Sequence, residues 1–436
     1  MSDLPRGWVE ARLDELGSWQ GGGTPDKSNA AYWTGGSIPW VSPKDMKRFH
    51  ISEAEDQITE AALAGSSANL VAGNSVLLVT RSGILKHTLP VALTGRDVAI
   101  NQDIKALTPH PELDPLFIAQ QIKSLGPFVL KNCTKAGTTV DSVDFERLKA
   151  VPANIPSLAE QKRIVAKLDA LNAKSARART ELARIETLVS RYKQAVLSKA
   201  FSGEYGGLTE QKRLGDATHI LSGYAFSSAD YVRTGIALVR IGDIVNGVVA
   251  LNDGTKRLPA EYLEIYRRFV LQHGDICIAL SGATTGKLGV FTASEPALLN
   301  QRVAVLRSQF HDDQRYVAPF AQFVSDQMLA AAYGGAQPNI SPKWLADQMI
   351  PWPSSEQRHS IRNRIESAFA KIDRLAKEAK RALALVGRLD EAILAKAFRG
   401  ELVPQDENDE PAEHLLARIR AERETAPKVR RGRGRT

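Results

Sequence analysis

Two long stretches of the chain keep apolar residues at alternating spacings of four and three positions, which is the heptad pattern of a coiled-coil helix. In the first stretch these positions are Ile164, Leu168, Leu171, Ser175, Ala178, Leu182, Ile185, Val189, Tyr192 and Val196. In the second they are Ile361, Ile365, Ala368, Ile372, Leu375, Ala379, Ala382, Val386, Leu389 and Ile393, each 197 residues after its counterpart. The constant offset predicts two related helices rather than two independent surface helices.

Both predicted helices carry the same start and stop signals. Ser157 and Ser354 each follow a proline and stand three residues before a glutamate or glutamine, which is the capping-box spacing of a helix N-terminus. Gly203 and Gly400 come after the last helical turn and suit a left-handed C-cap. We therefore expect each helix to run from its serine to its glycine.

The second half of the chain restates the first at an offset of about 200 residues. The clearest match closes each half, where residues 195–204 and 392–401 share seven identities in ten. Several shorter dipeptide matches occur in the same order along both halves. The chain is therefore predicted to be an internal duplication.

Connectivity predicts how the two helices pair. The first helix leads into the second globular segment, and the second helix starts at the end of that segment, so antiparallel pairing needs no long return connection. The heptad core of 33 residues per helix corresponds to about 50 Å at the helical rise of 1.5 Å per residue. We expect the globular segments at opposite ends of this rod, related by a pseudo-twofold axis.

Inside each globular segment, short β-rich runs alternate with Gly, Pro and Asn. This pattern indicates domains with twisted, mostly antiparallel sheets and a few helices. The expected strands are residues 38–41, 76–80, 91–93, 236–241, 276–280 and 303–306, and the expected helices are residues 115–125 and 315–332.

The predicted fold class is α+β, with two pseudo-twofold-related α/β domains separated by an antiparallel two-helix coiled coil. The expected parts are a first domain at residues 1–158, a central spacer helix at 159–205, a second domain at 206–354, a distal spacer helix at 355–402 and a tail at 403–436. Within the tail, residues 411–424 are expected to form a short helix, and the basic Arg/Gly end at 428–435 is expected to be disordered.

The composition, 43% hydrophobic and 24% charged over 436 residues, is that of a globular chain with two or three domains. No window approaches the roughly 18 consecutive apolar residues that a membrane helix needs, and the first residues lack a signal-peptide core. We therefore expect a cytoplasmic protein without membrane contacts. Cys133 and Cys277 show neither zinc-ligand nor disulfide spacing and are expected to be buried thiols.

The net charge of +8 suggests a nucleic-acid partner, but its location limits the argument. Residues 159–204 carry ten basic and five acidic side chains, and residues 356–401 carry eleven and seven. Residues 1–158 carry 15 and 17, and residues 205–355 carry 13 of each. A nucleic-acid surface on either domain must therefore be a local patch.

The motifs of common enzymes are missing or incomplete. Gly282 and Gly286 resemble a phosphate loop, but three residues separate them instead of four, and Leu288 stands where Ser or Thr would hold magnesium. The glycines at 21–23 lack the spacing of a dinucleotide-binding turn. We find no zinc-protease, serine-hydrolase, kinase, methyltransferase, helicase or nuclease signature. The sequence therefore predicts a protein that is not an enzyme.

The order of domain, heptad helix ending in Lys-Ala-Phe-x-Gly-Glu, domain and second heptad helix with the same ending resembles the DNA specificity subunit of type I restriction-modification systems. The resemblance covers essentially the whole chain. It also includes Leu4-Pro-x-Gly-Trp8, Ile38-Pro-Trp40-Val with Lys44-Asp45, Ile155-Pro with Glu160-Gln161-Lys-Arg-Ile164, and Leu402-Val-Pro-Gln-Asp with Glu410-Pro411.

The resemblance implies that each globular segment is a target recognition domain that reads one half of a bipartite sequence in double-stranded DNA. The helices would set the gap and dock two modification subunits, which carry the methyltransferase chemistry. Restriction subunits would add ATP-driven translocation and cleavage. S-adenosylmethionine, ATP and magnesium are then expected on the partner subunits, with no cofactor or metal bound by this chain.

Candidate DNA-contacting residues are the polar and basic side chains of loops that follow strands, because such groups bind base edges and phosphates. For each of them, an ordinary solvated loop side chain is the alternative. The first-domain candidates are Lys44, Lys47, Arg81, Ser82, Lys86, His87, Lys135, Thr138 and Thr139, and the second-domain candidates are Arg240, Ser281, Thr284, Thr285, Lys287, Gln337 and Asn339.

Other interpretations remain beside this one. The pairs Asn101-Gln102 and Asn300-Gln301 could bind adenine, but because both halves share them, stabilisation of a turn is favoured. The alternative class of function is a coiled-coil adaptor that joins two protein partners without DNA recognition. A fused methyltransferase would need a cofactor-binding domain, for which the chain has no unassigned length.

Overall fold

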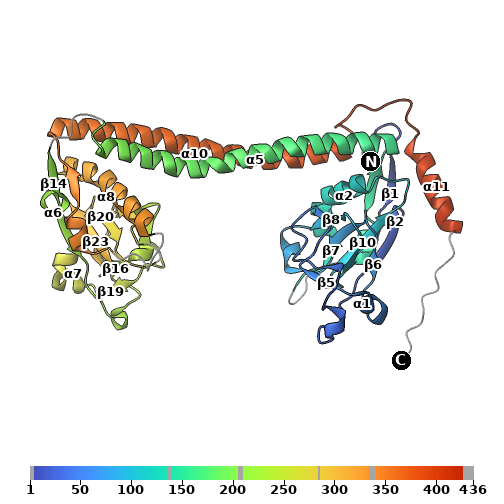
Figure 1. Cartoon of the computed structure of the whole chain (residues 1–436), viewed down its shortest axis with the longest axis horizontal. Helices are drawn as coiled ribbons and strands as arrows, with labels where there is room; N and C mark the ends of the chain where they lie inside the picture. Colours follow the sequence, from blue (N-terminus) through green and yellow to red (C-terminus); the bar gives the residue numbers. More distant parts are fainter. Residues whose placement is uncertain (1–3, 136–139, 205–209, 283–284, 333–339, 426–436) are drawn as a thin grey trace. The chain divides into compact units, whose positions relative to one another are not determined.

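The computed structural model describes residues 4–135, 140–204, 210–282, 285–332 and 340–425. The chain divides into two compact units, with Met1–Thr180 and Leu383–Thr436 in unit 1 and Glu181–Ala382 in unit 2. Each unit combines one globular domain with a section of each of two long helices, α5 (Leu158–Phe201) and α10 (Ser355–Phe398), as Figure 1 shows.

The domain of unit 1 contains two sheets. The first has the order β2 (Gly17–Gly21), β10 (Ile104–Pro109), β7 (Val76–Val79), β8 (Val91–Thr94) and β4 (His50–Ile51). The second has the order β5 (Asp56–Ile58), β3 (Ile38–Val41), β9 (Val98–Ile100) and β6 (Leu70–Val71). Two antiparallel pairs add β1 (Val9–Arg12) with β13 (Pro152–Ile155), and β11 (Thr134–Lys135) with β12 (Ser142–Val143).

Short helices connect and cover these strands. They are η1 (Ala30–Tyr32), α1 (Glu60–Gly65), η2 (Gly83–Lys86), α2 (Pro115–Ser124), α3 (Gly126–Cys133) and α4 (Phe145–Lys149). Helix α2 begins where predicted, because Asp114 accepts hydrogen bonds from the backbone N–H groups of Leu116 and Phe117. Its apolar residues, including Phe117 and Ile122, are buried in the core of unit 1.

The domain of unit 2 has the same plan. Its first sheet has the order β15 (His219–Ser222), β23 (Val303–Arg307), β20 (Ile276–Ala279), β21 (Leu288–Val290), β18 (Gly247–Val249) and β17 (Ile244–Val245). The second has the order β19 (Arg257–Leu258), β16 (Ile236–Val239) and β22 (Ala297–Leu299), and β14 (Gln211–Arg213) pairs with β24 (Met349–Pro351). The helices are α6 (Leu214–Ala217), η3 (Ser228–Asp230), η4 (Ile241–Asp243), α7 (Tyr262–Ile265), η5 (Arg267–Phe269), α8 (His311–Ala332) and α9 (Pro342–Ala346).

Strand pairing confirms that the two domains are copies of one fold. The order β2-β10-β7-β8 in unit 1 matches β15-β23-β20-β21 in unit 2. Each second sheet contains one parallel pair, β3 with β9 and β16 with β22. The copies differ where the short strand β4 is replaced by the β17–β18 hairpin, whose turn residues Asn246 and Gly247 both have positive φ angles. The sheets are mostly antiparallel, as predicted.

Three predicted strands run past their observed ends, β7 and β20 by one residue each and β16 by two. The run at residues 236–241 was expected to be extended throughout, but β16 stops at Val239. Arg240 N–H donates to the Asp243 carboxylate at 2.8 Å, and this bond starts the turn η4. The apolar residue Ile241 therefore belongs to a 3-10 turn rather than to the strand.

Helices α5 and α10 pair in antiparallel fashion within each unit. In unit 2, Lys193 Nζ lies 2.6 Å from Asp373 Oδ1, and Glu186 Oε1 lies 3.7 Å from Lys380 Nζ, so the numbering rises on one helix as it falls on the other. In unit 1, Arg179 is paired with Asp390 at 2.7 Å. The predicted antiparallel pairing is confirmed.

The capping signals are also found, with one difference. Ser354 and Gln357 form a complete capping box, in which each residue's backbone N–H donates to the other's side chain. Ser157 accepts from Glu160 N–H at 3.0 Å, but the Glu160 carboxylate instead accepts from Trp8 Nε1 at 3.1 Å. Both C-cap glycines have positive φ, 96° at Gly203 and 76° at Gly400.

The apolar heptad positions of α5 and α10, which we call the heptad seam, are not buried along the whole length of the two helices. Ile164, Leu168, Ile361 and Ile365 are buried because each also joins the core of its own unit's domain. Three other predicted seam residues expose half or more of their surface, Tyr192 and Leu375 at 60% and Leu389 at 53%. Two helices alone cannot cover an apolar stripe of this width.

The tail after α10 packs on unit 1. Its helix α11 (Ala412–Thr425) buries four apolar residues in the same core as Trp8 and Leu16, and these are Ala412, Leu415, Leu416 and Ile419. Arg418 contacts Glu112, and Arg420 contacts Glu15. The C-terminal segment is therefore part of the first domain's fold, and the basic end predicted at 428–435 lies outside the described residues.

Within the described ranges, no helix is both long and apolar enough to cross a membrane. Cys133 and Cys277 are buried and free, as predicted. Burial raises the pKa of both thiols above the usual value, so neither is a ready nucleophile.

Candidate nucleic-acid interface

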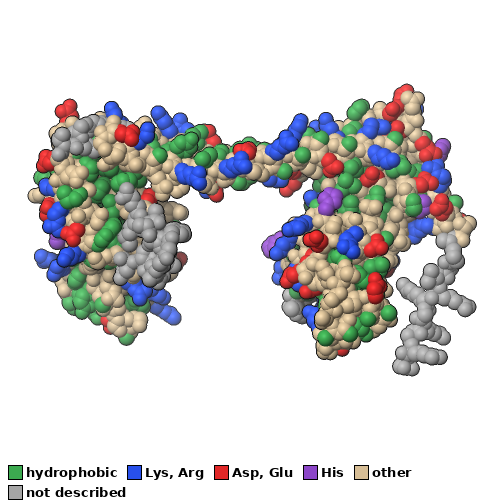
Figure 2. Space-filling model, in the orientation of Figure 1, with side chains coloured by type: hydrophobic (Ala, Val, Ile, Leu, Met, Phe, Trp, Pro, Cys, Tyr) green, Lys and Arg blue, Asp and Glu red, His purple; other side chains and the backbone are tan. Residues whose placement is uncertain are grey.

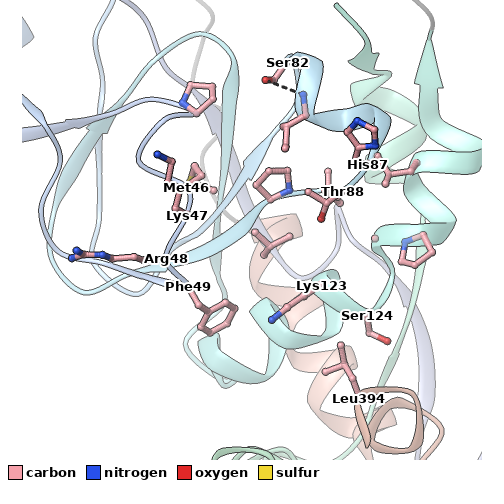
Figure 3. A pocket seen from close by; sticks show the side chains of 18 of the residues that line it. Met46, Lys47, Arg48, Phe49, Ser82, His87, Thr88, Lys123, Ser124 and Leu394 are labelled. Carbon is pink, nitrogen blue, oxygen red and sulfur yellow. Dashed lines mark hydrogen bonds between the residues drawn. The ribbon is translucent and has the colours of Figure 1, made fainter. Parts of the chain in front are cut away.

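A groove of about 1150 Å³ opens on unit 1 where the loops after β3 and β7 face the junction of α2 and α3. We call it the basic groove, and its basic and polar lining residues are Lys44, Lys47, Arg48, Ser82, His87, Thr88, Lys123 and Ser124. Among the described residues that line it, Glu391 of α10 is the one acidic residue. Figure 3 shows these loops around the groove, with Leu394 of α10 on its wall. Loops after strands line much of this groove, and such loops are where the sequence analysis placed the candidate residues.

Hydrogen bonds fix the two loops that line the groove. After β3, the Asp45 carboxylate accepts from Ser42 N–H and from Glu55 N–H, at 2.9 and 3.0 Å. After β7, the backbone N–H groups of Thr80 and Arg81 donate to the carbonyl of Asp103. Lys44, Lys47 and Arg48 are therefore presented from a turn held by hydrogen bonds.

The cations of the basic groove differ in their partners. Lys44 is held by Glu55 and Asp56 at 3.1 and 3.0 Å, and these hydrogen bonds raise its pKa. Lys47 and Arg48 are exposed and form no ion pair with a described residue. Lys123 Nζ lies 5.4 Å from the centre of the Phe49 ring. Lys47 and Arg48 are thus the cations most available to an anion.

Acidic side chains limit the extent of this patch. On the face of unit 1 seen in Figure 2, Lys and Arg side chains are mixed with Asp and Glu side chains. This agrees with the near-neutral charge of the domain and with the expectation of a local patch.

The structure groups four of the first-domain candidates, Lys44, Lys47, Ser82 and His87, around the basic groove. Arg81 and Lys86 are exposed next to it in sequence but do not line it. Lys135 is paired with Asp144 at 2.7 Å and lowers the pKa of that carboxylate. Thr138 and Thr139 lie outside the described residues.

Two cations of the groove were missed in the sequence. Arg48 directly follows a predicted residue, and only its loop position could have marked it. Lys123 lies in the last turn of α2, and its place in the groove depends on the fold.

Unit 2 has a smaller groove of about 460 Å³ at the equivalent place. It lies between the loop after β16, the loop after β20 and helix α8, and its polar lining residues are Asn246, Lys287, Gln322 and Asp326. Lys287 is exposed and was predicted, whereas the other three were missed. The two equivalent grooves therefore differ in their chemistry.

The other second-domain candidates have different surroundings. Thr285 is 4% exposed, and its hydroxyl donates to the Gly282 carbonyl at 2.7 Å within its own loop, so a DNA contact by Thr285 stays a prediction. Ser281 is half-buried. Arg240 is also half-buried, and its Nε atom is buried without a hydrogen-bond partner. Thr284, Gln337 and Asn339 lie outside the described residues.

The shared Asn residues stabilise turns, as favoured from the sequence. Asn101 Oδ1 accepts from Asp103 N–H at 3.1 Å, and Asn300 Oδ1 accepts from Arg302 N–H at 3.2 Å. Both bonds shape the turn before the central strands β10 and β23. An adenine contact is not needed to explain why both halves have these residues.

The fold and its grooves define a class of protein: two copies of one binding domain, joined through paired helices, with equivalent loop-lined grooves of different chemistry. Among the described residues, no group of three His, Cys, Asp or Glu side chains could hold a metal ion.

A family model described as the type I restriction modification DNA specificity domain matches residues 5–187 and 208–383. The match covers most of the chain, once in each half. The chain belongs to this family of type I restriction-modification specificity subunits.

Individual relatives agree with this assignment. The EcoR124I/EcoR124II specificity subunit of Escherichia coli is 43% identical over 157 residues, which are 36% of this chain and 39% of that protein. The EcoBI specificity subunit of Escherichia coli is 28% identical over 67% of this chain and 69% of its own length. The MjaIX specificity subunit of Methanocaldococcus jannaschii is 23% identical over 92% of this chain and 94% of its own length.

Two solved structures share the fold. A chain from a structure of complex assembly and conformational transition of the type I R-M system aligns with a TM-score of 0.71 at 21% identity, covering 92% of this chain and all (100%) of that one. An HsdS subunit from Thermoanaerobacter tengcongensis aligns with a TM-score of 0.59 at 20% identity, covering 92% and 98%.

Proposed function

We propose that this chain is the sequence-reading subunit of a type I restriction-modification complex, and that each domain reads one half of a bipartite target in double-stranded DNA. The observation that carries the proposal is the pair of equivalent grooves. Both are formed by loops that follow matched strands, but the first is lined by four Lys or Arg side chains and one carboxylate, Glu391, and the second by one Lys, two amides and one carboxylate. Two copies of one fold with different lining residues suit two unequal half-sites.

The paired helices would dock two modification subunits. Leu188 and Tyr192 of unit 2 are 42% and 60% exposed. Their counterparts 197 residues later, Leu385 and Leu389 of unit 1, are 58% and 53% exposed. In unit 2 the stripe borders an apolar groove of about 440 Å³ between α5 and α10. Each unit thus offers one exposed apolar stripe, which suits a helix of a partner subunit.

The catalytic residues for methylation and cleavage would belong to the modification and restriction subunits. We propose that S-adenosylmethionine binds to the modification subunits and that ATP and magnesium serve the restriction subunits, while this chain contributes recognition and no catalytic residue. The absence of enzyme motifs along the sequence supports this division. Purified alone, the chain should transfer no methyl group to DNA, and transfer without a partner subunit would contradict the division.

Methylation mapping tests the proposal. The chain is co-expressed with its modification subunit, and genome sequencing identifies the methylated motif. We expect one bipartite motif with a fixed gap. An adaptor that contacts no DNA would instead leave the motif unchanged when this chain is exchanged for another family member.

A domain exchange sharpens the test. Because α11 packs on the first domain, residues 1–158 and 403–436 should be exchanged together for those of another family member. One half of the motif should change and the other should stay the same. A change in both halves would contradict separate reading by the two domains.

A further inference from the structure

Asp326 is the one acidic residue among the described residues that line the groove of unit 2. It belongs to α8, and its neighbour Ser325 is buried and donates a hydrogen bond to the Gly286 carbonyl. This bond ties α8 to the loop after β20 that carries Lys287. The carboxylate of Asp326 is therefore presented at the groove from a helix that is hydrogen-bonded to the loop carrying Lys287.

The carboxylate keeps an oxygen for another donor. Gln322, one helical turn earlier, donates from Nε2 to Asp326 Oδ1 at 2.7 Å. No described Lys, Arg or His side chain forms an ion pair with Asp326, and Oδ2 accepts no hydrogen bond from a described residue. Burial raises the pKa of Asp326, and the hydrogen bond from Gln322 opposes this effect.

An unpaired carboxylate is unfavourable on a surface that faces a polyanion, because phosphate groups repel it. It becomes favourable only if the DNA supplies a hydrogen-bond donor. In the major groove the donors on base edges are the exocyclic amino groups, N4 of cytosine and N6 of adenine.

Building on the proposed function, we propose that Asp326 is a specificity-determining residue that accepts a hydrogen bond from the exocyclic amino group of a cytosine or adenine in the half-site read by unit 2. Gln322 is then a positioning residue, because it holds Oδ1 and leaves Oδ2 directed to the base. Lys287, exposed in the same groove, supplies a cation for the adjacent phosphate backbone.

Base analogues test this contact on the wild-type protein. The full chain is assembled with its modification subunits and bound to target duplexes. In each duplex, one cytosine or adenine of the second half-site is replaced by an analogue without the exocyclic amino group. We expect affinity to fall roughly tenfold or more at one position. A scan in which no position depends on its amino group overturns the inference, with no variant needed.

Two variants assign the contact to Asp326. D326A should bind the natural site more weakly and should show no further loss when the analogue stands at the sensitive position. E264A is the matched control, because it removes one exposed carboxylate of unit 2 on α7 and should keep the full analogue effect. Thermal unfolding of both variants should match that of the wild type.

The outcomes separate this inference from the proposed function. If D326A keeps the analogue effect, or binds all sequences more tightly by the same factor, Asp326 acts only through its charge and the inference is wrong. If the wild-type complex selects neither half-site, the proposed function itself fails.

Discussion

The lysines of the basic groove differ in how firmly acidic neighbours hold them. Lys44 would have to leave Glu55 and Asp56 before it could reach a phosphate. Lys47 has no such partner among the described residues. Two lysines in one loop are therefore expected to contribute unequally to DNA binding.

Replacing Lys47 with alanine should weaken binding of the assembled complex to all DNA sequences alike. It should also reduce the magnitude of the slope of log affinity against log salt by about one, because one counterion fewer is released. K44A should have a smaller effect, and K167A on the exposed face of α5 is the control. Affinity measured across a salt series checks this, and a larger loss for K44A than for K47A would contradict it.

At the scale of elements, the segment between α10 and α11 is hydrogen-bonded to the N-terminus of α5. Asp409 accepts hydrogen bonds from Arg163 at 3.2 and 2.7 Å and from the Ser157 hydroxyl at 2.9 Å. Ser157 is at the same time the N-cap that accepts from Glu160 N–H. The Arg163 guanidinium, aided by Ser157, lowers the pKa of Asp409 below its ordinary value.

D409N should destabilise unit 1 by about 1 kcal/mol at neutral pH, because the partly exposed ion pair loses its charge. Since the folded-state pKa is lowered, this stability is present above the ordinary carboxylate pKa of about 4 and is lost as pH falls through the lowered value. The difference between wild type and D409N in thermal unfolding should therefore shrink only below about pH 4. E413Q, an exposed change on α11, is the control, and a difference that persists unchanged in acid would rule out the ion pair as its cause.

The exposed apolar stripes of the helix pair lead to a prediction about assembly. L188D with Y192D should prevent docking of one modification subunit and leave the chain folded, because both side chains are already exposed. L385D with L389D should prevent docking of the other. Native mass spectrometry should show complexes with one modification subunit, whereas Q194D, an exposed polar change on α5, should keep two. Two docked subunits on either double variant would show that the stripes are not the docking surfaces.

At the scale of the whole molecule, both helices continue across the boundary between the two units. Seven residues inserted in phase in both helices, near Ala178 and Ala382, keep the heptad and lengthen each helix by about 10 Å. Ten base pairs of DNA span about 34 Å. The preferred gap between half-sites should therefore grow by roughly three base pairs, with weaker binding because the DNA must also turn.

The methylated motif of the insertion variant, determined by sequencing, checks this expectation. An insertion in one helix only should disrupt the pairing register and serves as the control. An unchanged gap in the double variant would falsify the idea that the helices set the spacing.

The sequence by itself determined the long helices, the duplication and three strands of each domain, which are β3, β7 and β8 in unit 1 and β16, β20 and β23 in unit 2. Helix periodicity and caps are local properties, so the heptads and Ser354 with Gln357 marked α10 without any knowledge of packing. The expected end of β16 was wrong because Asp243, three residues after Arg240, withdraws the Arg240 N–H from an extended strand. That competition depends on a side-chain bond that hydropathy does not encode.

Only the tertiary structure decided which side chains of the grooves are free to bind. A residue's type and loop position do not say whether a carboxylate distant in sequence will meet it, so Lys44 and Lys47 looked equivalent until Glu55 and Asp56 were placed beside Lys44. Thr285 is buried in its own loop, and Lys123 and Asp326 line the grooves because helices bring them next to loops that are distant in sequence. Local periodicity fixes the elements, while contacts between residues distant in sequence set the charge and exposure on which binding depends.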